Sequence, residues 1–495
     1  MLSGRSALKT LIDTTIISRG CYHTINKKSL YAKISPLGNP STDVTPELDK
    51  WVDSGNKVRF AELQRIIVDL RKRKRFSQAL QVSEWMKSRG DYTLTPVQHA
   101  VQLDLIGKVH GFLHAESFFN SLAEQDRTDK VHGALLHCYV RQRETERALA
   151  LLKTIRDKGL PLSSLAFNDI MCLYASIDEI DKVPEVFEQM KKHGVQPDNL
   201  SYRICINSFG VRSDIEGLEK ILNEMENDVH ITMDWNTYTV VANFYVKAGL
   251  KHKANISLQK AEKRVDNKDA LGYNHLISLH ARLGNNDDVF RLWSAEKIAC
   301  KRCHNREYIN MMEALVRLDE AEKAEEVLKE WETSENCYDF RVPNVLIVGY
   351  IEKGLCEKAE ALLNHLTETG KVSTPNIWGR LARRYLETGK IESALDSLKI
   401  ALSLQDPSKE HKLNDKVITE VVRLIVEKGS SADAERVTSL LRSMVRLERQ
   451  MYHTLLKSYI TSGKQVDRLV DIMRSDDYQE DEETLKILSL QQNAM

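Results

Sequence analysis

The chain has 495 residues, too many for one hydrophobic core, so it holds either several domains or one extended repeat array. Glycine (22) and proline (10) are scarce and no run of about 18 apolar residues occurs, which favours an all-α protein and argues against membrane insertion. The net charge is zero, but residues 1–40 hold six basic side chains and one acidic one, leaving 65 basic against 70 acidic side chains elsewhere. A uniformly basic surface for nucleic acid is therefore excluded, and such binding requires a local groove.

The first residues have the composition of a targeting segment. They are rich in Ser and Thr, carry spaced basic side chains such as Arg5, Lys9 and Arg19, and lack the continuous apolar block of a secretory signal. We therefore predict a mitochondrial transit peptide over residues 1–30, with a disordered basic tail as the alternative. Residues 31–54 contain the Pro-, Gly- and Ser-rich stretch 35–46 and are predicted to be a linker.

A period of about 35 residues follows. A small or apolar residue, expected midway along the second helix of each repeat, recurs at Ala79, Ala115, Ala148, Val183, Leu218, Ala254, Val289, Ala324, Ala359, Ala394 and Ala434. Seven residues further on, two helical turns away, each repeat has a second apolar residue, except where Glu296 stands. Glycines expected to close the first helices in left-handed geometry are Gly249, Gly284, Gly354, Gly389, Gly429 and Gly463. The pattern predicts stacked helix-turn-helix repeats over residues 55–475 and a short acidic C-terminal tail over 476–495.

Residues 165–198 resemble a pentatricopeptide repeat. Phe167-Asn168-x-Ile170 opens this segment, Phe187 and Met190 lie in its second helix, and Gly194-x-x-Pro197-Asp198 ends it. The openings at 236–249, 271–284 and 342–354 repeat the pattern. The tetratricopeptide repeat has nearly the same period, but its early Trp and Leu-Gly are missing here. The resemblance implies a right-handed superhelical α-solenoid of about twelve repeats.

Residues 51–90 are similar to the start of plant mitochondrial members of the plain-repeat (P) subfamily, and the C-terminal residues do not resemble a deaminase-like extension. In this family a polar residue early in the first helix and the last residue of the repeat together contact one nucleotide of single-stranded RNA. Transferred by position, the pairs are Asn168/Asp198, Arg203/Asp234, Thr239/Asp269, Asn274/His304, Ile309/Asp339 and Asn344/Thr374.

Two of these pairs match familiar family combinations. Asn168/Asp198 is similar to a combination that selects uridine, and Thr239/Asp269 to one that selects guanine. Ile309 offers no hydrogen bond, and the equivalent sites Ala100, Gly133 and Gly379 lack polar side chains. The alternative is that Asn168 and Thr239 cap first helices, and that Asp198 and Asp269 cap the helices that follow.

Other motifs carry less information. Cys300-x-x-Cys303 has the spacing of a zinc half-site, but no second Cys pair occurs, so we expect no metal and no cofactor. The basic run 71–75 is expected to be a solvated turn, with phosphate contact as the alternative. No phosphate loop, nucleophile elbow or HExxH motif supports an enzyme.

The resemblance implies a protein of the mitochondrial matrix that binds organellar mRNA or rRNA as a single strand in its concave groove. Its role would be stabilisation, processing or translation of RNA. One alternative is a structural or assembly subunit of the mitochondrial ribosome, in contact with ribosomal proteins, which the acidic body favours. Another is a helical scaffold that binds only protein.

Overall fold

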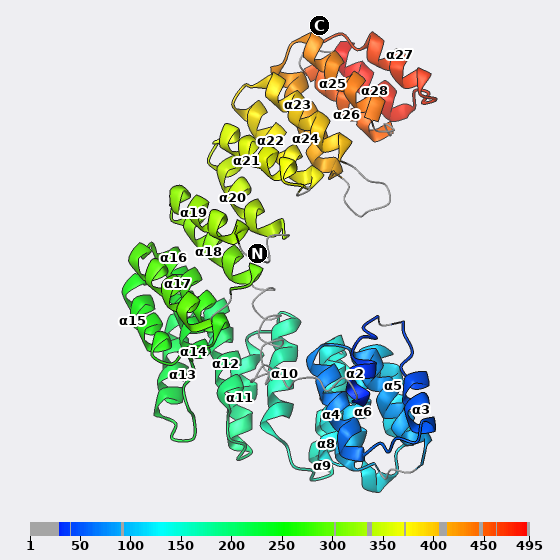
Figure 1. Ribbon diagram of the computed structural model, residues 1–495, viewed down its shortest axis with the longest axis vertical. Helices are drawn as coiled ribbons and strands as arrows, with labels where there is room; N and C mark the ends of the chain where they lie inside the picture. Colours follow the sequence, from blue (N-terminus) through cyan, green and yellow to red (C-terminus); the bar gives the residue numbers. More distant parts are fainter. Residues whose placement is uncertain are drawn as a thin grey trace. The chain divides into compact units, whose positions relative to one another are not determined.

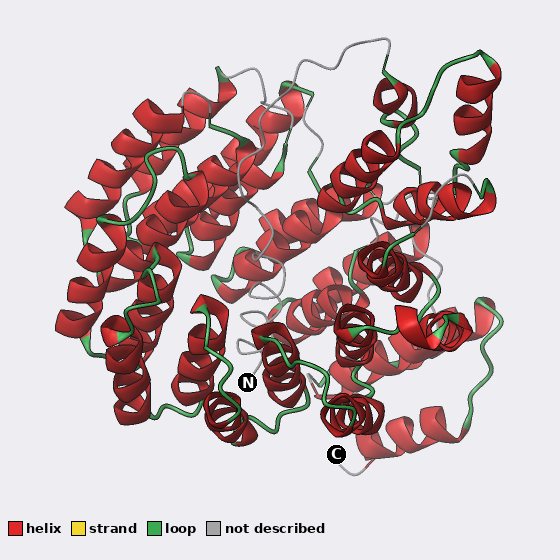
Figure 2. Ribbon diagram, turned by 90° about the horizontal axis from the view of Figure 1, so that it is seen from below, coloured by secondary structure: helices red, strands yellow, loops and turns green. Residues whose placement is uncertain are grey.

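The computed structural model describes residues 29–39, 41–90, 94–300, 303–333, 339–370, 373–404, 413–444, 449–461 and 463–492. Within these ranges every regular element is a helix and no strand occurs (Figure 2). No helix among them combines the length and apolar character that a bilayer crossing demands. The all-α prediction is therefore confirmed, whereas most of the predicted transit peptide, residues 1–28, lies outside the described residues.

The chain divides into two compact units, Met1–Arg264 and Val265–Met495, here called the N-terminal and C-terminal units. Six helix pairs form the described body of the N-terminal unit (Figure 1). They are α4 (Phe60–Lys72) with α5 (Phe76–Ser88), α6 (Pro96–Val109) with α7 (Phe112–Ser121), α8 (Asp129–Gln142) with α9 (Thr145–Asp157), α10 (Ser164–Ser176) with α11 (Lys182–Lys192), α12 (Asn199–Val211) with α13 (Ile215–Asn227), and α14 (Trp235–Lys247) with α15 (Lys251–Glu262).

The C-terminal unit repeats this arrangement. Its six pairs are α16 (Ala270–Leu283) with α17 (Asn286–Cys300), α18 (Asn305–Arg317) with α19 (Ala321–Glu332), α20 (Arg341–Glu352) with α21 (Cys356–Glu368), α22 (Pro375–Glu387) with α23 (Ile391–Ser403), α24 (Asp415–Lys428) with α25 (Ser431–Met444), and α26 (Arg449–Thr461) with α27 (Asp467–Ser475). Twelve pairs in total confirm the predicted number of repeats.

First helices stand beside first helices within each unit. In the N-terminal unit α6, α8, α10, α12 and α14 contact one another in order, and in the C-terminal unit α16 to α26 do so through their even-numbered members (Figure 1). Each repeat thus buries its apolar face against its neighbours, as a solenoid requires. The row of first helices is the surface on which the predicted RNA-contacting residues lie.

The recurring small residue marks the closest packing of each repeat. All eleven sites from Ala79 to Ala434 are fully buried, and the residues seven positions further on are all less than 9% exposed, Glu296 included. The expected place was wrong, however: the site is not midway along the second helix but in its first turn, usually as the fourth residue. A small side chain is needed there because the second helix leaves the tight turn directly against the first.

Most turns within repeats use the left-handed backbone. Gly249, Gly284, Gly354, Gly389 and Gly463 have φ between 67° and 82°, as predicted. Gly429 does not, since its φ is −87° and its ψ 172°. The extended Gly429 leads directly into Ser430, whose backbone N–H and hydroxyl donate to Asp433 at the start of α25. In five other repeats a non-glycine residue takes the left-handed place, at Lys74, Arg143, Asp178, Ser213 and Asp319.

The segment 31–54 is more than the linker that its composition indicated. It contributes most of α2 (Leu30–Ile34) and all of α3 (Thr45–Asp53), and Ile34, Val44 and Leu48 are fully buried. Trp85 Nε1 donates to Asp49 Oδ1 at 2.7 Å, so α3 is fastened to α5. The Pro- and Gly-rich composition described only the loop between α2 and α3, whereas these helices cover the start of the repeat array.

The C-terminal tail 476–495 likewise contains a packed helix. α28 (Glu482–Gln492) contacts α26, with Thr484 and Ile487 buried in the contact. His453 and Thr484 are hydrogen-bonded through Nε2 and Oγ1 at 2.9 Å. The acidic residues of the tail therefore precede or lie on a helix that covers the last repeat.

Candidate nucleic-acid interface

The predicted RNA-contacting residues occupy one position of successive first helices. Asn168, Arg203, Thr239 and Asn274 are each the fifth residue of α10, α12, α14 and α16, and Asn344 is the fourth residue of α20. They lie inside the helices, so the alternative that Asn168 and Thr239 act as N-caps is wrong. The second members of three pairs, Asp198, Asp234 and Asp269, are the N-caps of α12, α14 and α16, and their carboxylates accept backbone N–H groups there.

Asn168 and Asp198 are in direct contact. Asn168 Nδ2 donates to Asp198 Oδ1 at 3.1 Å, and the same oxygen accepts from the Ser201 backbone N–H at 2.8 Å. Burial works to raise the pKa of Asp198, but the hydrogen bonds from Ser201 and Asn168 outweigh it, and the pKa lies below its usual range. Asp198 is thus held ionised, caps α12 and fixes the orientation of the Asn168 amide.

Arg203 and Asp234 repeat this relationship with an ion pair. Arg203 Nη1 lies 2.6 Å from Asp234 Oδ2, while Asp234 Oδ1 accepts from the Thr237 backbone N–H at 2.9 Å. The Arg203 side chain is only 10% exposed. The Asp234 carboxylate therefore caps α14 and pairs with Arg203 at the same time.

The remaining predicted residues have different partners. Thr239 Oγ1 donates to the Asn236 carbonyl at 2.9 Å, and Asp269, in the other unit, accepts from Leu271 and Gly272 N–H. Asn274 Nδ2 lies 3.5 Å from Glu307 Oε1, not against His304, because Glu307 completes the capping box of α18 with His304. Glu307 does not occupy a recurring position of the repeat, so the repeat pattern could not predict this contact.

Three of these asparagines leave a hydrogen-bond acceptor unused. The amide oxygens of Asn168, Asn274 and Asn344 are buried and have no partner among the described residues. A buried acceptor without a partner costs about 1–3 kcal/mol, so native proteins keep few of them. An unused acceptor thus recurs at the equivalent position of three repeats, and a ligand with N–H groups would supply the missing hydrogen bonds.

The first helices α6 and α8 lack polar residues at the equivalent sites, Ala100 and Gly133, and carry a cluster of charged side chains further along. Around Asp104 on α6 lie Arg71 at 2.9 Å, Lys108 at 2.8 Å and Arg141 at 4.0 Å, contributed by α4, α6 and α8. Burial opposes ionisation of Asp104, yet Lys108 and Arg71 keep its pKa below the usual value. Three positive charges against one carboxylate make this end of the first-helix row electropositive.

The basic run 71–75 is a solvated turn only in part: Lys72, Arg73 and Lys74 are exposed, but three of its arginines have partners within the fold. Arg71 pairs with Asp104, the Arg73 guanidinium lies 5.8 Å from the centre of the Tyr31 ring, and Arg75 donates to the Ser35 carbonyl. The segment that precedes the repeats uses two of these arginines because its helices pack over the turn.

The acidic surplus is largely paired within the fold. Glu219 accepts from Tyr245 at 3.0 Å and pairs with Lys253 at 2.6 Å, and the Lys253 hydrogen bond lowers the pKa of Glu219. The same arrangement recurs when Glu226 meets Tyr238 and Lys260, and when Glu330 meets Tyr308 and Lys297. These pairs hold acidic and basic side chains against one another between repeats, so the acidic excess of the body is compatible with a local electropositive surface.

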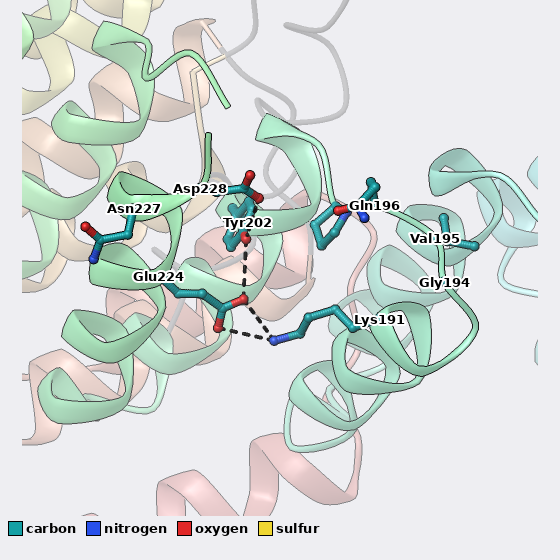
Figure 3. A pocket seen from close by; sticks show the side chains of 9 residues that line it. Lys191, Gly194, Val195, Gln196, Tyr202, Glu224, Asn227 and Asp228 are labelled. Atoms are coloured by element: carbon teal, nitrogen blue, oxygen red, sulfur yellow. Dashed lines mark hydrogen bonds and ion pairs between the residues drawn. The ribbon is translucent and has the colours of Figure 1, made fainter. Parts of the chain in front are cut away.

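A pocket of about 500 Å³ lies between the end of α11, the start of α12 and the end of α13. Figure 3 shows Lys191 and Tyr202 directed at Glu224, with Lys191 Nζ 2.9 Å and Tyr202 Oη 3.3 Å from one carboxylate oxygen. Tyr202 also contacts Asp228 Oδ2 at 3.1 Å. These groups satisfy one another, so the pocket is a weaker candidate for a ligand than the row of asparagines.

Glu296 interrupts the apolar stripe, as the sequence showed. It is fully buried in α17, and neither carboxylate oxygen has a hydrogen-bond partner among the described residues. Burial, reinforced by the charge of Glu307, raises the pKa of Glu296 to about 8. Cys300 and Cys303 lie near this end of α17, but within the described part of the chain no three His, Cys, Asp or Glu side chains converge as a metal site requires.

Comparison with known protein sequences identifies the family of this chain. The family model described as "PPR repeat family" matches residues 162–211, and the one described as "PPR repeat" matches 131–160, 308–335 and 342–370. A pentatricopeptide repeat-containing protein of Arabidopsis thaliana, named as mitochondrial, is 46% identical over 97% of this chain and 98% of its own length. The chain belongs to the pentatricopeptide repeat protein family. The resemblance of residues 165–198 to a pentatricopeptide repeat is thereby confirmed.

Two further pentatricopeptide repeat proteins are similar at lower sequence identity. A second one from Arabidopsis thaliana, also named as mitochondrial, is 33% identical, and the alignment covers 92% of each chain. The crystal structure of the maize pentatricopeptide repeat protein PPR10 is similar at 17% identity with a TM-score of 0.42, covering 93% of this chain and 75% of the maize chain.

Proposed function

We propose that this chain is a plain-repeat pentatricopeptide protein of the mitochondrial matrix that binds single-stranded organellar RNA along its first helices, without enzymatic activity. The proposal is carried by the buried amide oxygens of Asn168 in the N-terminal unit and of Asn274 and Asn344 in the C-terminal unit, which have no partner among the described residues. An unpaired base has N–H groups on its edges that such acceptors bind, and the orientation imposed by Asp198 makes the contact selective.

Basic residues further along the same helices supply contacts to the RNA backbone. Six first helices carry Lys or Arg as their thirteenth residue, namely Lys72, Lys108, Arg141, Lys247, Arg282 and Arg317. Burial and then the nearby charge of Arg317 lower the pKa of Arg282, so two like charges face one neighbourhood on α16 and α18. A phosphate between adjacent repeats would relieve that repulsion, and each neutralised phosphate releases counterions.

The proposed mitochondrial location is supported by the basic N-terminal segment and by the names of two related proteins, which include the word mitochondrial. Residues 1–40 fused to a fluorescent reporter should carry it into mitochondria, as the proposed transit peptide requires. A reporter that stays in the cytosol or enters plastids would contradict this location.

The role in RNA metabolism is tested by crosslinking the protein to RNA in isolated mitochondria and sequencing what is bound. A footprint on one or a few messenger sites supports a factor for stabilisation, processing or translation. A footprint confined to ribosomal RNA, with co-purifying ribosomal proteins, would make the chain a ribosomal component instead. Absence of RNA above a non-crosslinked control would contradict the proposal and leave the protein-binding scaffold.

A further inference from the structure

The hydrogen-bonding character of the first-helix row changes at one repeat. At Asn168, Asn274 and Asn344 the unused atom is an oxygen, which accepts. At Arg203, the equivalent residue of α12, the unused atom is Nε, which donates. The α12 repeat therefore offers the opposite polarity to the repeats that carry Asn168, Asn274 and Asn344.

A second donor stands beside the first. Asn207 lies one helical turn after Arg203 on the same face of α12, and its Nδ2 is buried without a partner. Arg203 and Asn207 are 8% and 7% exposed. Two buried donors one turn apart, with no acceptor within reach among the described residues, form a site for a group with two adjacent acceptors.

Arg203 is also prevented from pointing away. Its Nη1 is anchored 2.6 Å from Asp234 Oδ2, and Asp234 is fixed in turn by the backbone N–H and hydroxyl of Thr237. A guanidinium anchored through one nitrogen presents its remaining N–H groups in a fixed plane. The position of the donor is thus set by the protein before any ligand arrives.

We propose that the repeat containing α12 selects guanine through Arg203 and Asn207, which donate to the O6 and N7 atoms of the base. This inference rests on the proposed function and gives it a base identity at one repeat. On its Hoogsteen edge guanine presents O6 and N7 as two adjacent acceptors, whereas the same edge of adenine carries an amino group beside N7 and that of cytosine carries an amino group alone. The positive charge of Arg203 adds to the preference, since arginine paired with O6 and N7 is the commonest specific contact in DNA recognition.

The test uses the mature full-length protein and a randomised pool of single-stranded RNA, with wild type, Arg203→Asn and Arg203→Lys selected in parallel. Wild type should enrich guanine at the column contacted by the α12 repeat, separately from the guanine expected at the column of the neighbouring Thr239 repeat. Arg203→Asn should change that column towards the base selected at the Asn168 column, while the other columns stay unchanged. Arg203→Lys retains the charge but lacks the planar donors, so the guanine preference should fall by about tenfold.

Modified bases then show which edge of guanine the protein contacts. In the best enriched RNA, 7-deazaguanine at that column removes N7 and should weaken binding, whereas inosine keeps O6 and N7 and should bind almost as guanine does. Asn207→Leu should also reduce the guanine preference without lowering the melting temperature, because it removes a buried unpaired donor.

The outcomes separate three explanations. Unchanged columns in Arg203→Asn, or tolerance of 7-deazaguanine with loss of inosine binding, would overturn the proposed contact. An equal loss of affinity for all RNAs, with weaker salt dependence, would assign Arg203 to phosphate and also overturn it. Enrichment of no motif by wild type would contradict sequence-selective RNA binding itself, which is a failure of the proposed function and not of the Arg203 assignment alone.

Discussion

Asn168 Nδ2 donates a hydrogen bond to Asp198 Oδ1 at 3.1 Å, although thirty residues separate them in the chain. Asp198 begins α12 as its N-cap, and Asn168 is the fifth residue of α10, the preceding first helix. One carboxylate therefore links the stability of one helix to the side-chain orientation of its neighbour. The same relationship between Arg203 and Asp234 shows that it belongs to the repeat.

Replacement of Asp198 should separate the two roles. Asp198→Ala should lower the free energy of unfolding by about 0.5–2 kcal/mol because α12 loses its cap, whereas Asp198→Asn should lower it far less, since asparagine is an equally good cap. Chemical denaturation followed by circular dichroism measures both. An equal loss in the two variants would contradict the capping role.

The buried carboxyl of Glu296 makes stability depend on pH. Its pKa is raised from 4.5 in the unfolded chain to about 8 in the fold, so the folded protein holds the proton more tightly. The associated stability is complete below about pH 4.5 and is lost as the pH rises towards about 8. Wild type should therefore lose about 1 kcal/mol per pH unit across that window relative to Glu296→Gln.

Denaturation of both proteins at several pH values gives this difference directly. Glu313→Gln provides the matched control, because Glu313 is exposed on α18. A difference between wild type and Glu296→Gln that stays constant with pH would contradict the raised pKa, as would an equal pH dependence of the Glu313→Gln difference.

The helices before the first repeat should stabilise it. Leu48 is fully buried in α3, so Leu48→Ala should cost about 2–5 kcal/mol in unfolding free energy of the N-terminal unit. Val68 is 45% exposed on α4, and Val68→Ala should change it by less than about 0.5 kcal/mol. Equal, small effects of the two substitutions would mean that α3 does not contribute to the stability of the array.

The repeats themselves were predictable because periodicity is a local signal. Every site from Ala79 to Ala434 is buried, and the glycine turns at Gly249 and Gly284 have the expected backbone. Pattern alone did not show where in the second helix the site falls, since that depends on the length of the preceding turn. The departure at Gly429 follows from the Ser430 and Asp433 contacts that begin α25.

The side-chain partners of the site were less predictable, because they join residues that are adjacent only after stacking. Asn274 lies within hydrogen-bond distance of Glu307, which does not occupy a recurring position of the repeat. Asp104 lies near cations that come from three different helices. The helices α2 and α3 were not predicted because they are short and lie before the segment that has the 35-residue period. Their buried residues Leu30, Ile34 and Leu48 contact neighbours that the sequence alone does not identify.

We propose that the polar residues early in the first helices, such as Asn168 and Thr239, contact bases of the RNA. Both are buried inside their helices, at 2% and 3% exposure, and neither is a cap. The most direct measurement compares wild type with Asn168→Ala/Thr239→Ala for binding to the crosslinked RNA and to unrelated RNA of equal length. Discrimination between the two RNAs should fall by about 1–3 kcal/mol per site, the scale of a lost base contact. Unchanged discrimination accompanied by a lowered melting temperature would contradict base recognition at these positions.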